Sequence, residues 1–163
     1  MKKLIAIILA AIMVLSLSAF GIKNGLALLT RKPFTTVEER VVRSFLEDAW
    51  EHTNSGLVEI AKGNDDFFDA TYVSICYNSG QTNLAKANKQ LKEAIDYCKK
   101  YEDTEEIINY LSKAVAIHDE IQKINVTSKS SFSERTESLG VLIELVSDLF
   151  ENMDNAGKIV GLK

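Results

Sequence analysis

Apolar residues recur at steps of three and four along most of this chain, which is the spacing of one face of an α-helix. The first such stretch predicts a helix that begins at residue 35. Thr35 and Thr36 stand three residues before Glu38 and Glu39, so they offer two overlapping capping boxes, and Gly63 is a typical helix stop. The apolar stripe of this helix consists of Val37, Val41, Val42, Phe45, Leu46, Ala49, Trp50, Leu57, Ile60 and Ala61.

A second helix is predicted from about residue 65 to residue 101, with the Asn-Asp-Asp sequence at residues 64–66 as its cap. The apolar stripe keeps its register through residues 78–80, which favours one long helix. Residues 78–80 are Asn-Ser-Gly, however, and this sequence is typical of turns. A bend or turn near Gly80 therefore stays open as an alternative, and it would divide this segment into two helices.

A third helix is predicted from Asp103, which offers a capping box with Glu106, to about Ile124. Acidic residues cluster at the start of this helix and of the second one. They complement the positive end of the helix dipole there, so a structural role is sufficient to explain them. Residues 125–131 are polar and lack a helical period, and we expect them to form a loop.

A fourth helix is predicted to begin after Ser131, which offers a capping box with Glu134. Its apolar seam keeps the steps of three and four and consists of Leu139, Leu142, Val146, Leu149 and Met153. Residues 154–163 contain two glycines and follow the end of this seam. We expect them to form a loose C-terminal tail.

No stretch shows the alternation of apolar and polar residues that is typical of an exposed strand. Four helices joined by short links predict an all-α fold, an antiparallel up-and-down bundle over residues 35–153, with a fifth helix only if the second one bends. If the first two helices pair about Gly63, Gly80 lies near residues 45–50. Its missing side chain would then make room for an aromatic ring from the first helix.

Residues 1–21 have the pattern of a secretory signal or a membrane anchor. Two lysines precede an uncharged run from Leu4 to Phe20, which is what bacterial-type export machinery recognises. Small residues up to Gly21 fit cleavage before Ile22, and this would release the rest of the chain. The alternative is an uncleaved anchor, since the run is at the lower limit of a membrane-spanning helix. Residues 22–34 are predicted to be a connector.

The charge balance argues against nucleic acid as a partner. The whole chain has a net charge of −4, and the two lysines within residues 1–21 leave −6 for the remainder. Phosphate binding depends on clusters of lysine and arginine, and no such cluster occurs in the sequence.

From residues 1–21 we predict an exported protein, which is extracellular or in the cell envelope. It contacts a membrane only through residues 1–21, if they are retained.

The two cysteines, Cys76 and Cys98, both lie on the second predicted helix. If that helix is continuous, a rise of about 1.5 Å per residue places them roughly 33 Å apart, whereas a disulfide needs Cα atoms within about 7 Å. We therefore expect no disulfide between them. Both are expected to be buried as small apolar side chains.

Motifs for catalysis and cofactor binding are missing from the sequence. A di-iron bundle needs Glu-x-x-His on two helices, and neither His52 nor His118 has a glutamate three residues before it. The chain also lacks Cys-x-x-Cys-His for haem, Gly-x-Ser-x-Gly for a serine nucleophile and a glycine-rich phosphate loop. We therefore predict a protein that is not an enzyme and holds no metal or cofactor, with both histidines beside an apolar stripe.

Aromatic residues crowd the region of the first two predicted helices and the link between them. They either pack in the core or form an exposed rim or groove that binds a partner or ligand. As a candidate interaction surface we name Trp50, Phe67, Phe68, Tyr72 and Tyr77.

The function predicted from the sequence is therefore binding, with a protein as the partner. One alternative is a carrier of a small ligand or cofactor, with a pocket between helices near Trp50 and Tyr72. The other is a membrane-tethered accessory or sensor domain, which requires that residues 1–21 are not cleaved.

Overall fold

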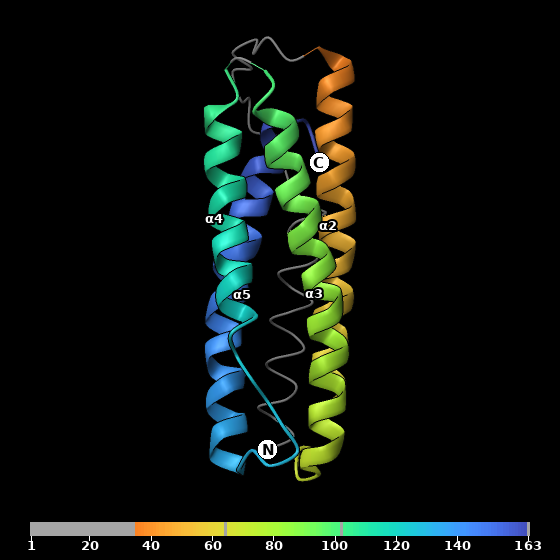
Figure 1. Cartoon of the computed structure of the whole chain (residues 1–163), viewed down its shortest axis with the longest axis vertical. Helices are drawn as coiled ribbons and strands as arrows, with labels where there is room; N and C mark the ends of the chain where they lie inside the picture. The colour runs from red at the N-terminus through yellow and green to blue at the C-terminus, as the bar shows by residue number, and fades with distance from the viewer. Residues whose placement is uncertain (1–34, 64, 102, 163) are drawn as a thin grey trace.

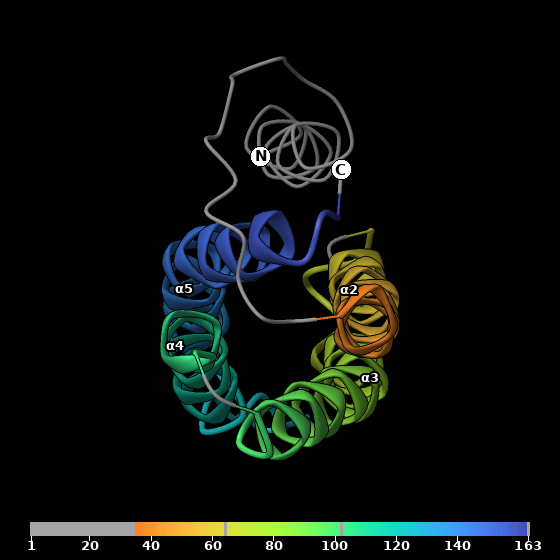
Figure 2. The same cartoon turned by 90° about the horizontal axis from the view of Figure 1, so that it is seen from above.

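The computed structural model describes residues 35–63, 65–101 and 103–162. Consecutive helices run in opposite directions along one long axis (Figure 1), and from above they form a ring in chain order (Figure 2). The predicted all-α, up-and-down bundle is confirmed, whereas the predicted signal or anchor at residues 1–21 and the connector at residues 22–34 lie outside the described residues. The four helices of the described part are α2 (Thr36–Lys62), α3 (Ala70–Cys98), α4 (Glu105–Ile121) and α5 (Phe132–Ile159).

The core of the bundle is built from the apolar stripe of each helix. Every helix contributes at least one leucine that is at most 2% exposed, and burying one such side chain contributes about 1.5–3 kcal/mol. The outer faces of the helices are largely polar, and none of the helices described is long and apolar enough to cross a membrane. The fully buried leucines are Leu46, Leu57, Leu84, Leu91, Leu111 and Leu149.

The N-terminal caps of α5 and α3 differ in how well they match the sequence predictions. At α5, the predicted box is confirmed: the Ser131 hydroxyl accepts a hydrogen bond from the Glu134 N–H (3.3 Å), and the Glu134 carboxylate accepts one from the Ser131 N–H. At α3, the cap predicted at residues 64–66 is wrong. Asp69 caps this helix instead, because its carboxylate accepts bonds from the backbone N–H groups two and three residues later.

The capping boxes predicted at Thr35 and Asp103 are not formed. Thr35 is the N-cap of α2, but its side chain makes no capping hydrogen bond within the described residues. Asp103 lies in a left-handed turn (φ 59°) before α4, and Thr104 is the N-cap. The Thr104 hydroxyl donates to the Cys98 carbonyl (2.9 Å), so it closes the turn between α3 and α4.

Helix α3 is continuous through residues 78–80, which confirms the favoured prediction of one long helix. Gly80 faces α2, where a Cβ atom would overlap Ile60 Cγ1 and lie 2.5 Å from the Gly56 carbonyl oxygen. A Cβ atom on Gly56 would lie 2.9 Å from the Gly80 carbonyl oxygen. The two glycines therefore allow the backbones of α2 and α3 to approach closely.

The predicted position of Gly80 near residues 45–50 is wrong, because it assumed that α2 and α3 pair about Gly63. The connection between the helices extends from Gly63 to Asp69, so the point about which they pair lies further along the chain. Gly80 is therefore opposite Gly56 and Ile60, and its missing side chain accommodates a backbone rather than an aromatic ring.

The prediction of a loose tail from residue 154 is wrong. Helix α5 continues to Ile159, and Ala156 and Val160 are at most 1% exposed. The chain end is also held by α2, since Arg43 Nε and Nη2 both donate to the Val160 carbonyl oxygen (3.2 and 2.7 Å). The apolar seam continues past Met153, and this continuation outweighs the glycine at position 157.

The connection between α4 and α5 is a loop, as predicted, and it packs on the bundle. It crosses toward the α2–α3 turn before entering α5 (Figure 1). Val126 is 3% exposed, and its carbonyl oxygen accepts a hydrogen bond from Ser74 of α3 (3.3 Å). Gln81 of α3 donates to the Ile121 carbonyl oxygen (3.0 Å) at the end of α4. The loop is therefore part of the folded core rather than a free link.

We predict that Gly80→Ala lowers the free energy of unfolding by about 1–3 kcal/mol, because the added methyl group overpacks the α2–α3 contact. Gly140→Ala is the matched control, since Gly140 lies within α5 and has nothing within 4 Å of its Cβ position. This control should gain about 0.5–1 kcal/mol from helix propensity. Urea unfolding followed by far-UV circular dichroism measures both changes, and equal stability of the two variants would contradict the close approach.

Candidate functional site

The five aromatic residues proposed from the sequence do not form one surface. Trp50 and Tyr77 are 5% and 4% exposed, so they belong to the core. Trp50 packs against Phe150 of α5 with ring centroids 4.9 Å apart, and burial raises the pKa of Tyr77 to about 12. The structure leaves Phe68 and Tyr72 exposed at the α2–α3 turn, with Phe67 half-buried beside them.

An aromatic cluster forms where the α2–α3 turn meets the start of α5. The Phe68 ring stacks on the Phe132 ring, with centroids 5.6 Å apart and an interplanar angle of 19°. Phe67 meets the same ring edge-on at 5.3 Å. Phe68 and Phe132 are 67% and 45% exposed although they are large and apolar. We call this cluster, together with the exposed side chains of Tyr72 and Ile75 on α3, the aromatic end.

Phe132 and Ile75 are absent from the set that the sequence suggested. Phe132 lies seven residues before Leu139, so it continues the apolar seam of α5 and would be assigned to the core on spacing alone. It is exposed because it occupies the first turn of α5, beyond the end of the packed seam. The α5 capping box is the sequence feature from which the exposure of Phe132 could be predicted, because it places this residue at the tip of the bundle.

Arg135 fixes the aromatic end to the rest of the fold. It is 6% exposed, and its guanidinium group donates to the Phe67 carbonyl oxygen (3.0 Å) and to the Ser130 carbonyl oxygen (2.5 Å). The same group lies over the Phe67 ring, 5.4 Å from its centroid. One side chain of α5 thus joins the α2–α3 turn to the α4–α5 loop. Sequence reasoning missed it because it stands among polar residues that are typical of a solvent-exposed face.

Acidic groups border the aromatic end. Asp65 and Asp66 are exposed in the α2–α3 turn, and Asp69 is the exposed cap of α3. Glu134 lies in the first turn of α5, where hydrogen bonds from the Ser131 backbone and side chain lower the pKa of its carboxyl group. These groups are negatively charged at neutral pH, so the apolar surface has an anionic rim.

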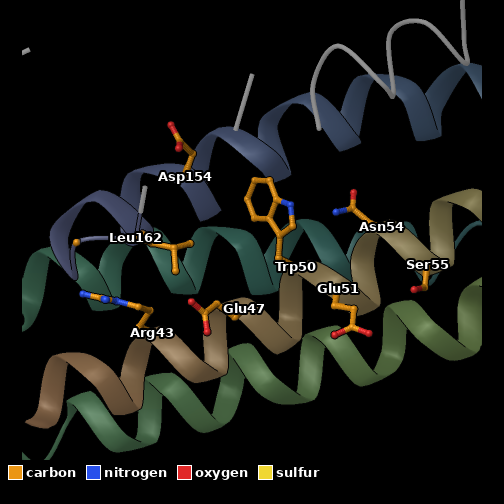
Figure 3. Close-up of a pocket in the computed structure, with 10 residues that line it drawn as sticks. Arg43, Glu47, Trp50, Glu51, Asn54, Ser55, Asp154 and Leu162 are labelled. Carbon is orange, nitrogen blue, oxygen red and sulfur yellow. The ribbon is translucent and has the colours of Figure 1, made fainter. Parts of the chain in front are cut away.

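A groove lies between α2 and the C-terminal part of α5 and has a volume of about 690 Å³; we call it the α2–α5 groove. Trp50 lies in the wall of this groove, with charged side chains on either side (Figure 3). Trp50 lines this groove and Tyr72 does not, so the groove matches the pocket predicted near these two residues only in part. The lining side chains include Arg43, Glu47, Trp50, Glu51, Asp154 and Leu162.

The sequence predicted that His118 lies beside an apolar stripe at the edge of the core. This is wrong, because His118 lies inside the core. It is 0% exposed, and its Nε2 atom faces the Thr53 hydroxyl across the bundle (3.4 Å). Thr53 donates its own proton to the Ala49 carbonyl oxygen (2.8 Å), so the Nε2–H of a neutral imidazole donates to Thr53. His118 Nδ1 has no hydrogen-bond partner among the described residues. Burial lowers the pKa of His118 to about 4.

Asp119 follows His118 but is held by α3. Asn88 Nδ2 and Lys92 Nζ of α3 contact the same carboxylate oxygen at 2.6 and 3.2 Å. Desolvation opposes the charged form, yet these contacts lower the pKa of Asp119 overall. The carboxylate is therefore held by α3. Burial of the imidazole is the largest effect on the pKa of His118 and lowers it, while the negative charge of Asp119 favours protonation of His118 and the positive charge of Lys92 opposes it.

Thiol and metal chemistry depend on how the cysteines and the possible metal ligands are placed. Cys76 and Cys98 are free and buried, as predicted, and burial raises the pKa of Cys98 to about 11. A thiol with so high a pKa is a poor nucleophile at neutral pH. Across residues 35–63, 65–101 and 103–162, no group of three or more His, Cys, Asp or Glu side chains is arranged to hold a metal ion.

Comparison with protein-family models, with curated proteins and with solved structures finds no match to this chain.

We predict that acid weakens the fold through His118. The unfolded state binds a proton below about pH 6.5, whereas the folded state does so only below about pH 4. The free energy of unfolding should therefore fall by about 3 kcal/mol as the pH drops through this window, and this contribution is complete above it. His118→Leu should lose this part of the pH dependence, and His52→Asn should keep it. Urea unfolding at a series of pH values measures the slope.

Proposed function

We propose that this protein acts by binding a protein partner on the aromatic end and that it is not an enzyme. The observation that carries the proposal is the stacked and exposed pair of Phe68 and Phe132. Large aromatic side chains dominate the binding energy of protein interfaces when a partner covers them. Apolar side chains gathered on an otherwise polar surface are typical of interaction sites.

The aromatic end is also preorganised. Arg135 holds the Phe67 carbonyl and the Ser130 carbonyl at once, and Asp69 caps the helix that bears Tyr72. Side chains that are ordered before binding lose little conformational freedom when the complex forms. A partner therefore meets a fixed aromatic surface at the tip of a long bundle.

The chemistry of the surface indicates what kind of partner fits. The centre is aromatic and aliphatic, and the rim carries Asp65, Asp66 and Asp69. The complementary surface has apolar side chains at its centre and lysine or arginine around them. Charges at a rim mainly accelerate association and select the partner, while the buried centre supplies most of the affinity.

The proposed location is outside the cytoplasm, in the cell envelope or beyond it. This part of the proposal rests on residues 1–21, which combine two lysines with an uncharged apolar run. If the segment is cleaved, the bundle is released as a binding protein. If it is retained, the bundle is an accessory or sensor domain tethered to the membrane, with the connector at residues 22–34 as its stalk.

Photo-crosslinking in the source cells tests the aromatic end. A photoreactive phenylalanine analogue at position 68 should yield one discrete crosslinked product, because this side chain would lie at the centre of the interface. The matched position is Val37, which is 63% exposed at the opposite end of the bundle and should yield none. Phe132→Ser should abolish the product at position 68 while the circular dichroism spectrum stays unchanged. Equal crosslinking at positions 68 and 37 would contradict the proposal.

Export is tested separately by following the N-terminus. We expect the protein to be recovered outside the cytoplasm, with a mature sequence that begins near Ile22. Subcellular fractionation followed by intact mass measurement provides both results. A full-length chain in the membrane fraction would favour the tethered form, and a full-length chain in the cytoplasm would contradict export.

A further inference from the structure

The α2–α5 groove has the dimensions of a small-molecule site. Helices α2 and α5 are neighbours in the ring but pack less closely than the other neighbouring pairs. The groove between them has a volume of about 690 Å³, within the range of roughly 300–1,000 Å³ that is usual for ligand sites. The groove is lined by residues 43–55 of α2, whereas the aromatic end begins after α2 ends at Lys62. The inference about the groove therefore does not rest on the function proposed for the aromatic end.

Trp50 provides an unused hydrogen-bond donor in the wall of this groove. The residue is 5% exposed, and its Nε1 atom is buried without a hydrogen-bond partner in the described part of the chain. The indole lies between α2 and α5, with its nitrogen on the edge nearer Asn54 (Figure 3). Leaving a buried donor unpaired is unfavourable, because the group has lost its hydrogen bonds to water. A ligand that carries an acceptor would remove this cost.

The charge of the groove is mostly negative. Glu47 and Glu51 flank Trp50 on α2 and form no ion pair with any described residue. Arg43 is one turn from Glu47, but two of its nitrogens are committed to the Val160 carbonyl oxygen. Like charges one turn apart destabilise a helix slightly, so a bound cation would relieve the repulsion between the two glutamates.

We infer that the α2–α5 groove binds a small organic cation that has an apolar body and a hydrogen-bond acceptor. The cationic group lies beside Glu47 and Glu51, the apolar body packs between Trp50 and Leu162, and the acceptor pairs with Trp50 Nε1. The face of a tryptophan ring also attracts cations directly. An anion would instead meet the carboxylates of Glu47 and Glu51, while the Asp154 carboxylate is paired with Lys158 Nζ (2.6 Å).

Trp50 allows a direct test because it is the only tryptophan in the chain. Its indole N–H is a single resonance in the NMR spectrum of the ¹⁵N-labelled full chain. The probe is 2-(4-methoxyphenyl)ethylamine, which has a cation, an aromatic body and an ether oxygen. We expect it to shift the indole resonance in a saturable manner. The matched neutral and anionic probes are 2-(4-methoxyphenyl)ethanol and 3-(4-methoxyphenyl)propionate, and both should bind more weakly.

Two comparisons assign the parts of the ligand. Glu47→Gln combined with Glu51→Gln should weaken binding of the amine roughly three- to tenfold. Binding of the alcohol should stay unchanged in this variant. The control carries the same charge change on α5, Glu137→Gln with Glu144→Gln, and should bind the amine as the wild type does. Replacing the methoxy group of the amine by a methyl group should cost about fivefold through loss of the acceptor.

Several results would overturn the inference. It fails if the alcohol or the carboxylate binds as tightly as the amine, or if the two glutamine substitutions leave amine binding unchanged. It also fails if the amine binds while the indole resonance stays in place, or if no binding is seen up to the solubility limit of the amine. None of these results bears on the aromatic end, which the crosslinking experiment tests.

Discussion

The close approach of α2 and α3 at Gly56 and Gly80 is the constraint on which the arrangement of the bundle depends. Each glycine lies where a Cβ atom would collide with the opposite helix. The two helices therefore form the tightest pair, α5 packs mainly on α4, and the ring closes loosely between α2 and α5. The α2–α5 groove lies at this loose closure, and the aromatic end lies at the tip where the tight pair turns.

Polar contacts in the core fix how the helix pairs face each other. Thr53 and His118 meet in the core between α2 and α4. At the edge of the core, the buried Asn88 of α3 donates to Asp119 of α4, whose side chain is 46% exposed. Apolar packing alone tolerates small slips of one helix along another, whereas a buried polar pair is satisfied in one register only. This arrangement requires a neutral His118. A protonated imidazole would also donate from Nδ1, and Nδ1 has no acceptor among the described residues.

Two arginines perform the same physical task at opposite ends of the molecule. Arg43 binds the Val160 carbonyl and holds the chain end, and Arg135 binds the Phe67 and Ser130 carbonyls and holds two loops. The rigid guanidinium fork suits this purpose because it donates several bonds in a fixed geometry. With both cysteines free, these contacts and the helical core hold the described fold together without a disulfide.

The sequence by itself determined the all-α fold and the α5 capping box, because these follow from local spacing and capping chemistry. It favoured one long helix through residues 78–80 but left a turn there open, and the tertiary structure decided that α3 is continuous. Only the tertiary structure decided which residues face each other across the α2–α3 turn and which side chains are buried, because these depend on turn length and on packing. It placed Gly80 opposite Gly56, buried Trp50 and His118, folded the segment after residue 154 and exposed Phe132. A helical period shows which residues share a face, but only the packed neighbours decide whether that face is covered.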